Sequence, residues 1–427
     1  MGAKLAKAAQ QEGVASSKGA LVDVQGTVGL TKSAESAASP SSSGTSTAST
    51  PSNSNGGNGA TGTEEVIRLQ EEYTHDATGA KVEVTDFELL KVLGKGAYGK
   101  VMLCRRKQDT KEVLYAMKTM RKATLLKRDQ IAHAHTERYI LQNLHCPFLT
   151  RLVYAFQTPD KLYMCLEYLP GGELFFWLKK ERRFSEERVR LYTAELTLAL
   201  EAMHEADIVY RDIKPENILL DVQGHIRVTD FGLAKGSITG AGMDGGTATF
   251  CGTPEYLAPE MLENKGHGKA VDWWALGTLV YEMLVGLPPF FDQNVQRMYH
   301  KILHDTLRFP KGENREVSES AKSLLRGLLQ RKVMDRLGST NDAQDLKDSP
   351  FFDELDFTRV YTKGYTPKFQ PPMMRSSSDV RNFDQEFTRE NAVDSVVDSL
   401  MSPTLQEKTR FEGFTYEGGE KEKALLV

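Results

Sequence analysis

The sequence lacks the features of secreted, membrane-spanning and metal-cluster proteins. Only four of its 427 residues are cysteines, and their wide spacing without a CxxC pair predicts reduced intracellular thiols rather than disulfides or a zinc site. They are Cys104, Cys146, Cys165 and Cys251. The most apolar stretch, Trp273–Tyr281, has nine residues, which is too few to span a bilayer and favours a buried helix.

Two further absences narrow the class of protein. No apolar signal segment opens the chain, and position 6 is alanine where a myristoylation signal on Gly2 needs serine or threonine. The 54 basic and 58 acidic side chains nearly balance, so the net charge of −4 argues against a strongly basic nucleic-acid binder. We therefore expect a cytoplasmic protein, with the nucleus left open as a second location, that has no integral membrane segment and no nucleic-acid partner.

Composition divides the chain into regions. Residues 33–62 contain only Ser, Thr, Ala, Gly, Asn and Pro apart from Glu35, and nothing there offsets the entropy of ordering. We expect residues 1–80 to form a disordered, low-complexity arm. Residues 353–417 are irregular but rich in aromatics, which predicts a regulatory tail that wraps another part of the molecule. Residues 418–427 are expected to be a frayed end.

The segment between the arm and the tail, 87–352, predicts an α+β fold with two lobes. Three β-like runs come first, and a helix is expected over Asp129–Leu144. The runs are Phe87–Leu93, Lys100–Cys104 and Val113–Met117. Helical periodicity then dominates, in Glu186–His204, Asp272–Leu284 and Ser318–Leu329. We expect a small β-rich lobe with one key helix, a larger and mainly helical lobe, and a cleft between them.

A glycine-rich run provides the first functional indication. Gly94, Gly96, Gly99 and Val101 form a GxGxxGxV pattern, in which glycine lets backbone N–H groups approach phosphates. Such a run also opens dinucleotide-binding folds, but there a helix follows immediately. Here the β-like run continues to Cys104, which favours a β-hairpin covering a nucleotide.

Lys118 and Glu137 follow the glycine-rich run and are candidates for an ion pair. Lys118 ends an apolar β-like run 19 residues after Gly99. Glu137 shares a helix face with His133 at i and i+4. Taken singly, each side chain would be an ordinary surface charge. Together they predict that Glu137 holds Lys118 against nucleotide phosphates.

A third run is far more specific. Asp212, Lys214 and Asn217 lie in a polar loop between apolar segments, and Asp230 opens a DFG tripeptide thirteen residues after Asn217. Phosphoryl transfer needs hard oxygen ligands for Mg²⁺, a cation at the moving charge and a carboxylate that accepts the hydroxyl proton. Asn217 and Asp230 supply the ligands, Lys214 the cation and Asp212 the base.

At this point the chain resembles the eukaryotic protein kinases over about Phe87–Phe352. Ala258-Pro-Glu260 matches the end of the activation segment, Arg336 the expected partner of Glu260, and Asp272 the start of the helix that anchors the catalytic loop. Tyr210 replaces the usual histidine before Arg211 and Asp212, a variant common in one branch.

The resemblance implies an ATP site. Adenine would lie under Val101 and Ala116 and bind the backbone at Glu167 and Leu169, with Leu166 as gatekeeper. The implied ATP-binding residues are Leu93, Gly94, Gly96, Gly99, Val101, Ala116, Lys118, Glu137, Glu167, Leu169, Glu173 and Asp230.

The activation segment from Thr249 to Glu260 and the FxxF[ST][FY] run at Phe411–Tyr416 are similar to the AGC group. Within it, the chain is most similar to ribosomal-protein-phosphorylating kinases, protein kinase B and serum- and glucocorticoid-induced kinase. The resemblance implies phosphorylation of Thr249 by a phosphoinositide-dependent-type kinase and of Thr415 by a hydrophobic-motif kinase. A turn-motif site is expected at Ser402, with Ser395 as the alternative.

The resemblance also implies a substrate preference. Glu173, Glu216 and Glu282 align with positions that bind arginine, which favours Arg at −3 and also at −5 from the phosphoacceptor. Thr253 is expected beside the substrate. A monomer is the default. Two alternatives remain open: a nucleotide-binding scaffold or pseudokinase that acts through its tail, and a small-molecule kinase on the same fold.

Overall fold

The computed structural model describes residues 82–419 except 97–98, 110–112, 243–245, 311–315, 373–378, 396–401, 403–404 and 407–408. The arm expected over 1–80 and most of the end expected over 418–427 lie outside these residues. All described residues belong to one compact unit, Gly59–Val427.

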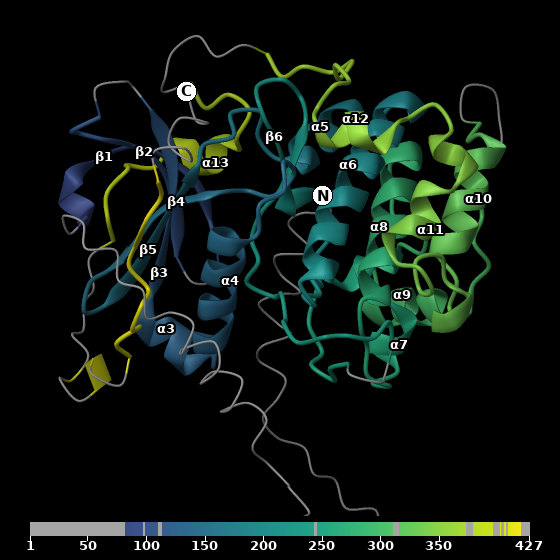
Figure 1. Cartoon of the computed structure of the whole chain (residues 1–427), viewed down its shortest axis with the longest axis horizontal. Helices are drawn as coiled ribbons and strands as arrows, with labels where there is room; N and C mark the ends of the chain where they lie inside the picture. Colours follow the sequence, from purple (N-terminus) through teal and green to yellow (C-terminus); the bar gives the residue numbers. More distant parts are fainter. Residues whose placement is uncertain are drawn as a thin grey trace, which may run out of the picture. The chain divides into compact units, whose positions relative to one another are not determined.

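An antiparallel sheet forms the first lobe (Figure 1). Its strands, in spatial order, are β1 (Phe87–Lys95), β2 (Lys100–Arg106), β3 (Leu114–Arg121), β5 (Lys161–Glu167), β4 (Leu152–Gln157) and β8 (Tyr416–Glu417). Helices α3 (Lys122–Lys127) and α4 (Ile131–Asn143) follow β3 in the chain. The predicted β-like runs begin within one residue of β1, β2 and β3, but each strand continues two to four residues beyond the predicted end. The sixth strand belongs to the tail.

The second lobe is mainly helical. Its helices are α5 (Leu174–Glu181), α6 (Glu186–Glu205), α7 (Pro259–Leu262), α8 (Ala270–Val285), α9 (Val295–His304), α10 (Glu319–Leu328), α11 (Ala343–Lys347) and α12 (Phe357–Tyr361). A two-stranded hairpin, β6 (Ile218–Leu220) and β7 (Ile226–Val228), follows α6. The short helix α13 (Gln385–Thr388) lies in the tail and contacts β1. The α+β class with a β-rich and a helical lobe is confirmed.

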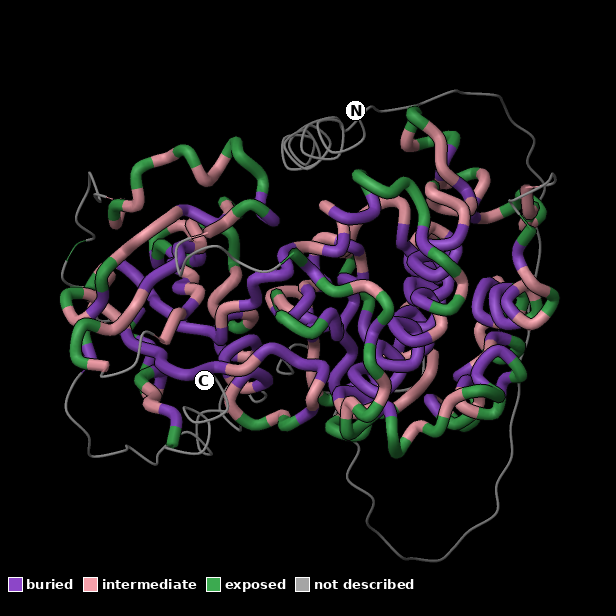
Figure 2. The backbone as a smooth tube through the Cα atoms, turned by 90° about the horizontal axis from the view of Figure 1, so that it is seen from above, coloured by how far each residue is buried: buried purple, intermediate pink, exposed green. Residues whose placement is uncertain are grey.

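Helix α8 is the centre of the helical lobe. It packs against α6 and α10, and most of its residues are buried. Figure 2 shows buried residues in the interior of the described chain and exposed ones mostly in the peripheral loops. It ends at Gly286, where φ of +100° suits glycine. Helix α6 begins at Ser185, whose hydroxyl accepts the Arg188 N–H, and Glu186 and Glu187 favour its N-terminus. These two long helices carry the segments that build the site.

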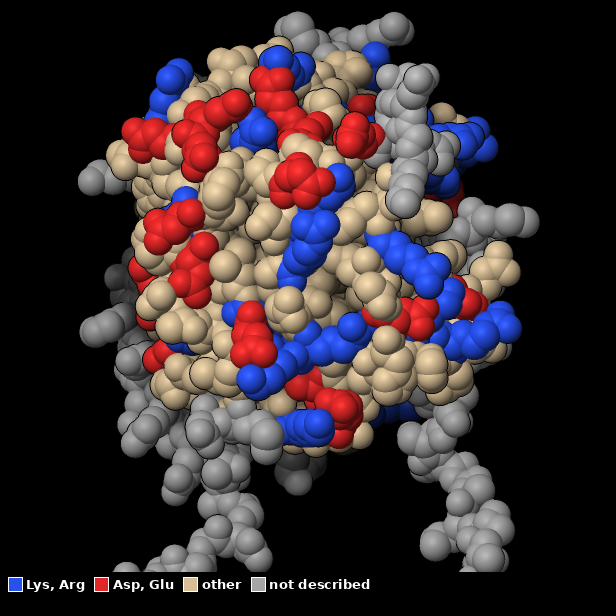
Figure 3. Space-filling view, turned by 90° about the vertical axis from the view of Figure 1, so that its right-hand side faces the viewer, with Lys and Arg blue, Asp and Glu red and all other residues tan. Residues whose placement is uncertain are grey.

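The surface of the helical lobe carries both signs of charge. On the face shown in Figure 3, basic and acidic side chains are interspersed rather than separated into large patches. Ion pairs such as that of Lys347 on α11 with Glu201 on α6 use some of these charges between elements. None of the helices in the described part of the chain is both long and apolar enough to cross a membrane.

Candidate active site

The glycine-rich run forms the β1–β2 hairpin. The Gly96 N–H donates to the Gly99 carbonyl at 2.9 Å. A Cβ on Gly99 would lie 1.7 Å from the Thr119 carbonyl oxygen, so only glycine fits there. A Cβ on Gly94 or Gly96 would meet nothing within 4 Å, which leaves this backbone open to a ligand. Residues 97–98, between these glycines, lie outside the described residues.

Lys118, Glu137 and Asp230 meet behind this hairpin. The Lys118 ammonium nitrogen lies 2.6 Å from Glu137 Oε1 and 2.8 Å from Asp230 Oδ1. Burial alone would lower the pKa of Lys118, but the two carboxylates raise it above its usual value. The Lys118 charge in turn lowers the pKa of Asp230. Burial raises the pKa of Glu137, against the effect of the Lys118 charge. Lys118 and Asp230 are therefore both charged at neutral pH.

The catalytic-loop residues converge on one carboxylate. Asp212 Oδ2 accepts hydrogen bonds from Lys214 Nζ at 2.7 Å and from Asn217 Nδ2 at 2.7 Å. Its other oxygen, Oδ1, lies 3.4 Å from the Thr253 hydroxyl. Burial raises the pKa of Asp212, against the effect of Lys214. A carboxylate with a raised pKa is a stronger proton acceptor, which suits a base.

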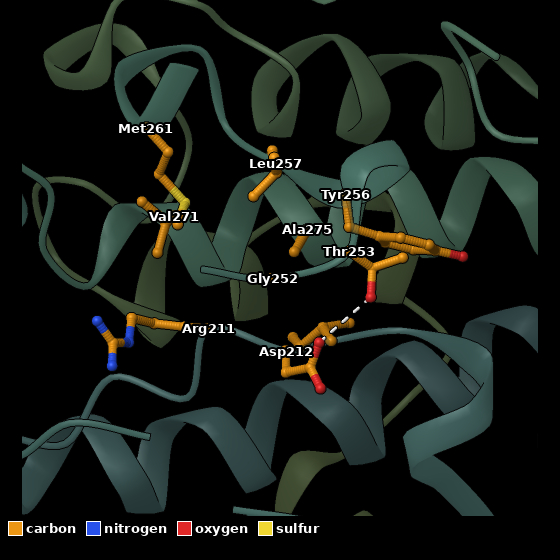
Figure 4. Close-up of a pocket in the computed structure, with 10 residues that line it drawn as sticks. Arg211, Asp212, Gly252, Thr253, Tyr256, Leu257, Met261, Val271 and Ala275 are labelled. Carbon is orange, nitrogen blue, oxygen red and sulfur yellow. Dashed lines mark hydrogen bonds between the residues drawn. The ribbon is translucent and has the colours of Figure 1, made fainter. Parts of the chain in front are cut away.

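A small cavity adjoins this carboxylate between the catalytic loop and the activation segment (Figure 4). The Thr253 hydroxyl points toward Asp212, whereas the Arg211 side chain extends in the other direction. Leu257 and Tyr256 also line the cavity. The arrangement leaves Asp212 Oδ1 as the oxygen that faces the activation segment.

Asp230 and Asn217 fit a Mg²⁺ site. Asn217 uses its Nδ2 group on Asp212, so its amide oxygen is the atom available to a cation. Asp230 is held at φ of +60°, and half of its side chain is exposed. Phe231, the next residue, is buried against Tyr210 at 5.7 Å between ring centroids. One carboxylate and one amide oxygen are the hard donors that Mg²⁺ prefers.

The adenine side of the site is apolar. Leu93, Val101 and Ala116 belong to one cluster, and the β3–β5 pairing places Ala116 opposite Leu166. The Glu167 carboxylate points elsewhere, because it accepts from the Arg151 N–H at 3.0 Å and from Arg227 Nε at 3.2 Å. Recognition of a base is therefore left to the backbone at Glu167 and Leu169.

Sequence reasoning missed two tail residues at this site. Phe383 joins the apolar cluster of Leu93 and stacks on Tyr168 at 6.0 Å. The neighbouring Asn382 donates to the Pro170 carbonyl at 2.9 Å. The aromatic run at Phe383 was a visible signal, but contacts across about 210 positions do not follow from local periodicity. The tail thus contributes to the apolar cluster that is predicted to hold adenine.

The carboxylates of Glu216, Glu255 and Glu282 lie close together near the activation segment. Burial raises the pKa of Glu282 to about 7, with Tyr256 lowering it and Glu216 and Glu255 raising it further. The Tyr256 hydroxyl donates to Glu282. Glu173 lies at the N-terminus of α5 and bridges to β6 at Leu219. Glu255 was not predicted.

Thr249 lies outside the cleft, beside a group of cations. It is exposed, and its hydroxyl lies 3.3 Å from that of Thr247, which also accepts from Lys235 Nζ at 3.1 Å. Arg211 Nη1 and Nη2 are buried and have no hydrogen-bond partner among the described residues. Burial lowers the pKa of His133, and the nearby charges of Arg211 and Lys235 lower it further. Arg211, Lys235 and His133 therefore form a basic cluster in which two guanidinium nitrogens of Arg211 have no acceptor among the described residues.

The predicted tail sites also lie away from the cleft. Phe411 and Phe414 are buried, and Phe411 stacks on His135 of α4 at 4.8 Å. Arg138 of α4 donates to the Phe414 carbonyl at 2.7 Å, and Thr415 is exposed. Ser402 is exposed and caps a turn through the Leu405 N–H.

Ser395, the alternative turn-motif residue, lies against the sheet. Its carbonyl accepts from Lys161, which also pairs with Asp394 at 2.7 Å. The structure therefore brings the predicted ATP, metal and catalytic residues together and leaves the three predicted phosphosites elsewhere.

Comparisons with known proteins agree with this geometry. The family model described as protein kinase domain matches residues 87–352, and that described as protein kinase C terminal domain matches residues 374–416. The chain is 50% identical to serine/threonine-protein kinase YPK1 of Saccharomyces cerevisiae, over 81% of this chain and 49% of that protein. It is 47% identical to serine/threonine-protein kinase Sgk2 of Rattus norvegicus, over 78% of this chain and 89% of that protein. It is also 47% identical to RAC-beta serine/threonine-protein kinase of Homo sapiens, over 80% of this chain and 70% of that protein. The chain thus spans about half the length of the yeast relative.

Proposed function

Because the chain belongs to the protein kinase domain family and carries the C-terminal domain of the AGC type, we propose that it is a serine/threonine protein kinase. It transfers the γ-phosphate of ATP to protein hydroxyls. The observation that carries this proposal is the setting of Asp212, whose Oδ2 is held by Lys214 and Asn217 while Oδ1 faces the activation segment.

The residues divide the chemistry between them. A substrate hydroxyl oxygen forms the new bond to the γ-phosphorus, the bond to the β–γ bridging oxygen breaks, and ADP leaves. Asp212 Oδ1 takes the hydroxyl proton, and Lys214 lies close enough to neutralise the moving charge. Lys118 holds the α- and β-phosphates. A Mg²⁺ ion bound by Asp230 and Asn217 would supply further charge stabilisation.

Substrate choice follows from the acidic cluster. Glu216, Glu255 and Glu282 are close enough to influence one another, so they offer a local negative charge to arginine side chains. Together with Glu173 at the N-terminus of α5, they support a preference for Arg at −3 and −5. Thr253 hydrogen-bonds the base and would contact the phosphoacceptor.

Regulation by phosphorylation is supported by the basic cluster of Arg211, Lys235 and His133 near Thr249. A phosphate on Thr249 would pair with Arg211, Lys235 and His133, and it would give Arg211 Nη1 and Nη2 the acceptor that the described residues do not provide. A phosphate on Thr415 would extend the contact of the tail with α4. A phosphoinositide-dependent-type kinase and a hydrophobic-motif kinase are the proposed partners, with a monomer as the working unit in the cytoplasm and nucleus.

The test compares wild-type protein with Asp212→Asn. We expect wild-type protein to phosphorylate an RxRxxS peptide with MgATP, and Asp212→Asn to lose transfer while its affinity for ATP changes little. Unaltered turnover in Asp212→Asn would contradict the assigned base. ATP binding without transfer by the wild type would favour a scaffold that acts through its tail.

A further inference from the structure

Asp342 has an unusual backbone conformation for a residue outside every motif. Its φ of 52° and ψ of −132° lie in a region that glycine enters readily and other residues rarely adopt. It precedes the short helix α11. A residue that keeps such a conformation must be held by its contacts, which makes those contacts informative.

The Asp342 carboxylate is held by two helices. Its Oδ1 accepts from Trp273 Nε1 of α8 at 2.9 Å and lies 2.8 Å from His204 Nδ1 of α6. The His204 side chain is fully buried, and its other nitrogen, Nε2, lies 2.9 Å from Asp272 Oδ2. Because both ring nitrogens face carboxylate oxygens, both must be donors, and the ring is an imidazolium.

Asp272 carries the chain of hydrogen bonds into the catalytic loop. Its Oδ2 also accepts from the Tyr210 N–H, and its Oδ1 accepts from the Arg211 N–H, each at 2.8 Å. Arg211 has φ of +65°, so the backbone directly before Asp212 is itself strained. A continuous path therefore runs from Asp342 through His204 and Asp272 to the residue that precedes the proposed base.

We infer that Asp342 is a positioning residue for phosphoryl transfer, which acts by keeping His204 protonated so that Asp272 stays fixed under the catalytic loop. This inference rests on the proposed function for the direction of its effect on activity. Glycine would adopt the same backbone without strain, so the contacts of the Asp342 carboxylate are what hold this residue in its strained conformation.

The electrostatics support this role. The charged groups that face His204 are Asp272 from α8 and Asp342 from the loop before α11. Burial would lower the pKa of His204, but the hydrogen bonds and charges of these carboxylates raise it to about 9. A raised histidine pKa stabilises the fold fully below its ordinary value of 6.5, and the contribution is lost as pH rises through about 9.

The test uses Asp342→Gly and Asp342→Asn in the full chain. We expect Asp342→Gly to change its melting temperature little, because relief of backbone strain offsets the lost contacts with His204 and Trp273, yet to lose about tenfold in kcat with KM for ATP unchanged. Asp342→Asn retains the two acceptor contacts but not the charge. It should move the alkaline decline of kcat to lower pH, because His204 then loses its proton more easily.

Asp345→Asn, in the helix α11 that Asp342 precedes, is the matched control. Asp345 accepts from the Gly338 N–H at 3.3 Å and the Asn341 N–H at 3.1 Å, rather than from His204. It should change the melting temperature at most, with kcat and its pH profile unaltered. If the Asp342 variants behave in the same way as this control, the role of Asp342 is structural and the inference is wrong.

An activity-independent measurement separates this inference from the proposed function. The ring resonances of His204, assigned by their loss in His204→Gln, should report an imidazolium at pH 8 in the wild type and a lower pKa in Asp342→Asn. A neutral ring at pH 8 in the wild type would overturn the inference even in an active kinase. A charged ring in a protein without phosphotransfer would instead contradict the proposed function alone.

Discussion

The ammonium nitrogen of Lys118 lies 2.6 Å from Glu137 Oε1, and this ion pair joins β3 to α4. The Glu137 side chain is only 3% exposed, so water offers little alternative partner. The next residue on α4, Arg138, donates to the Phe414 carbonyl of the tail. Two neighbouring positions of one helix therefore link Lys118 to the docked tail.

The ion pair gives the first prediction. Glu137→Gln should lower kcat/KM for ATP by about 10- to 100-fold, because a hydrogen bond between charged groups contributes about 1.5–3 kcal/mol. Steady-state kinetics would measure the loss, with a thermal melt to verify folding. Glu88→Gln is the control, since its pair with Arg105 at 2.8 Å is exposed and should matter little. Equal losses in both variants would contradict the assignment.

The acidic cluster predicts a pH-dependent substrate affinity. The pKa of Glu282 is raised to about 7, so its carboxylate becomes neutral as pH falls through that value. The KM for an arginine-containing peptide should therefore rise on mild acidification, while KM for ATP changes less. In Glu282→Gln this dependence should weaken, with a high KM throughout. A KM that is independent of pH in the wild type would exclude Glu282 from arginine recognition.

Docking of the tail gives the third prediction. Phe414 is 1% exposed, and truncation of a buried phenylalanine costs about 3–5 kcal/mol. Phe414→Ala should release the end of the tail, speed its proteolysis and lower kcat, because α4 loses its contact through Arg138. Tyr361→Ala removes an aromatic ring that is 45% exposed and serves as the control. A released tail with full activity would separate docking from catalysis.

The fourth prediction concerns the stability of the helical lobe. Arg336 Nη1 and Nη2 lie 2.7 and 2.8 Å from the two carboxylate oxygens of Glu260, and the Arg336 side chain is fully buried. Glu260→Gln leaves this guanidinium uncompensated, which costs about 3–5 kcal/mol. Urea unfolding would measure this loss in the free energy of unfolding. Glu319→Gln, in an exposed pair with Lys322, should cost less than about 1 kcal/mol.

Local sequence patterns were sufficient to predict several helices and strands and many residues of the candidate active site. Helix α6 was predicted at Glu186–His204 and spans Glu186–Glu205, since its periodicity and its Ser185 cap agree. The lysine, the two aspartates and the asparagine of the cleft were named from spacing, and the structure brings them together.

What the sequence could not supply depends on contacts between distant segments. The β-like run ending at Met117 continues as a strand to Arg121, because β3 pairs with β5 as far as Lys161. Phe383 packs in the apolar cluster of Leu93, and Asp342 contacts His204, in each case from more than 130 positions away. Neither position has a periodic or local signal for its partner, so only the folded chain reveals it.

The most direct test of the account is phosphate transfer from MgATP to an RxRxxS peptide, with and without phosphate on Thr249. Turnover that rises steeply when Thr249 is phosphorylated would support both the catalytic assignment and the cation cluster around Arg211. Failure of the phosphorylated protein to transfer phosphate, although it binds ATP, would contradict the account.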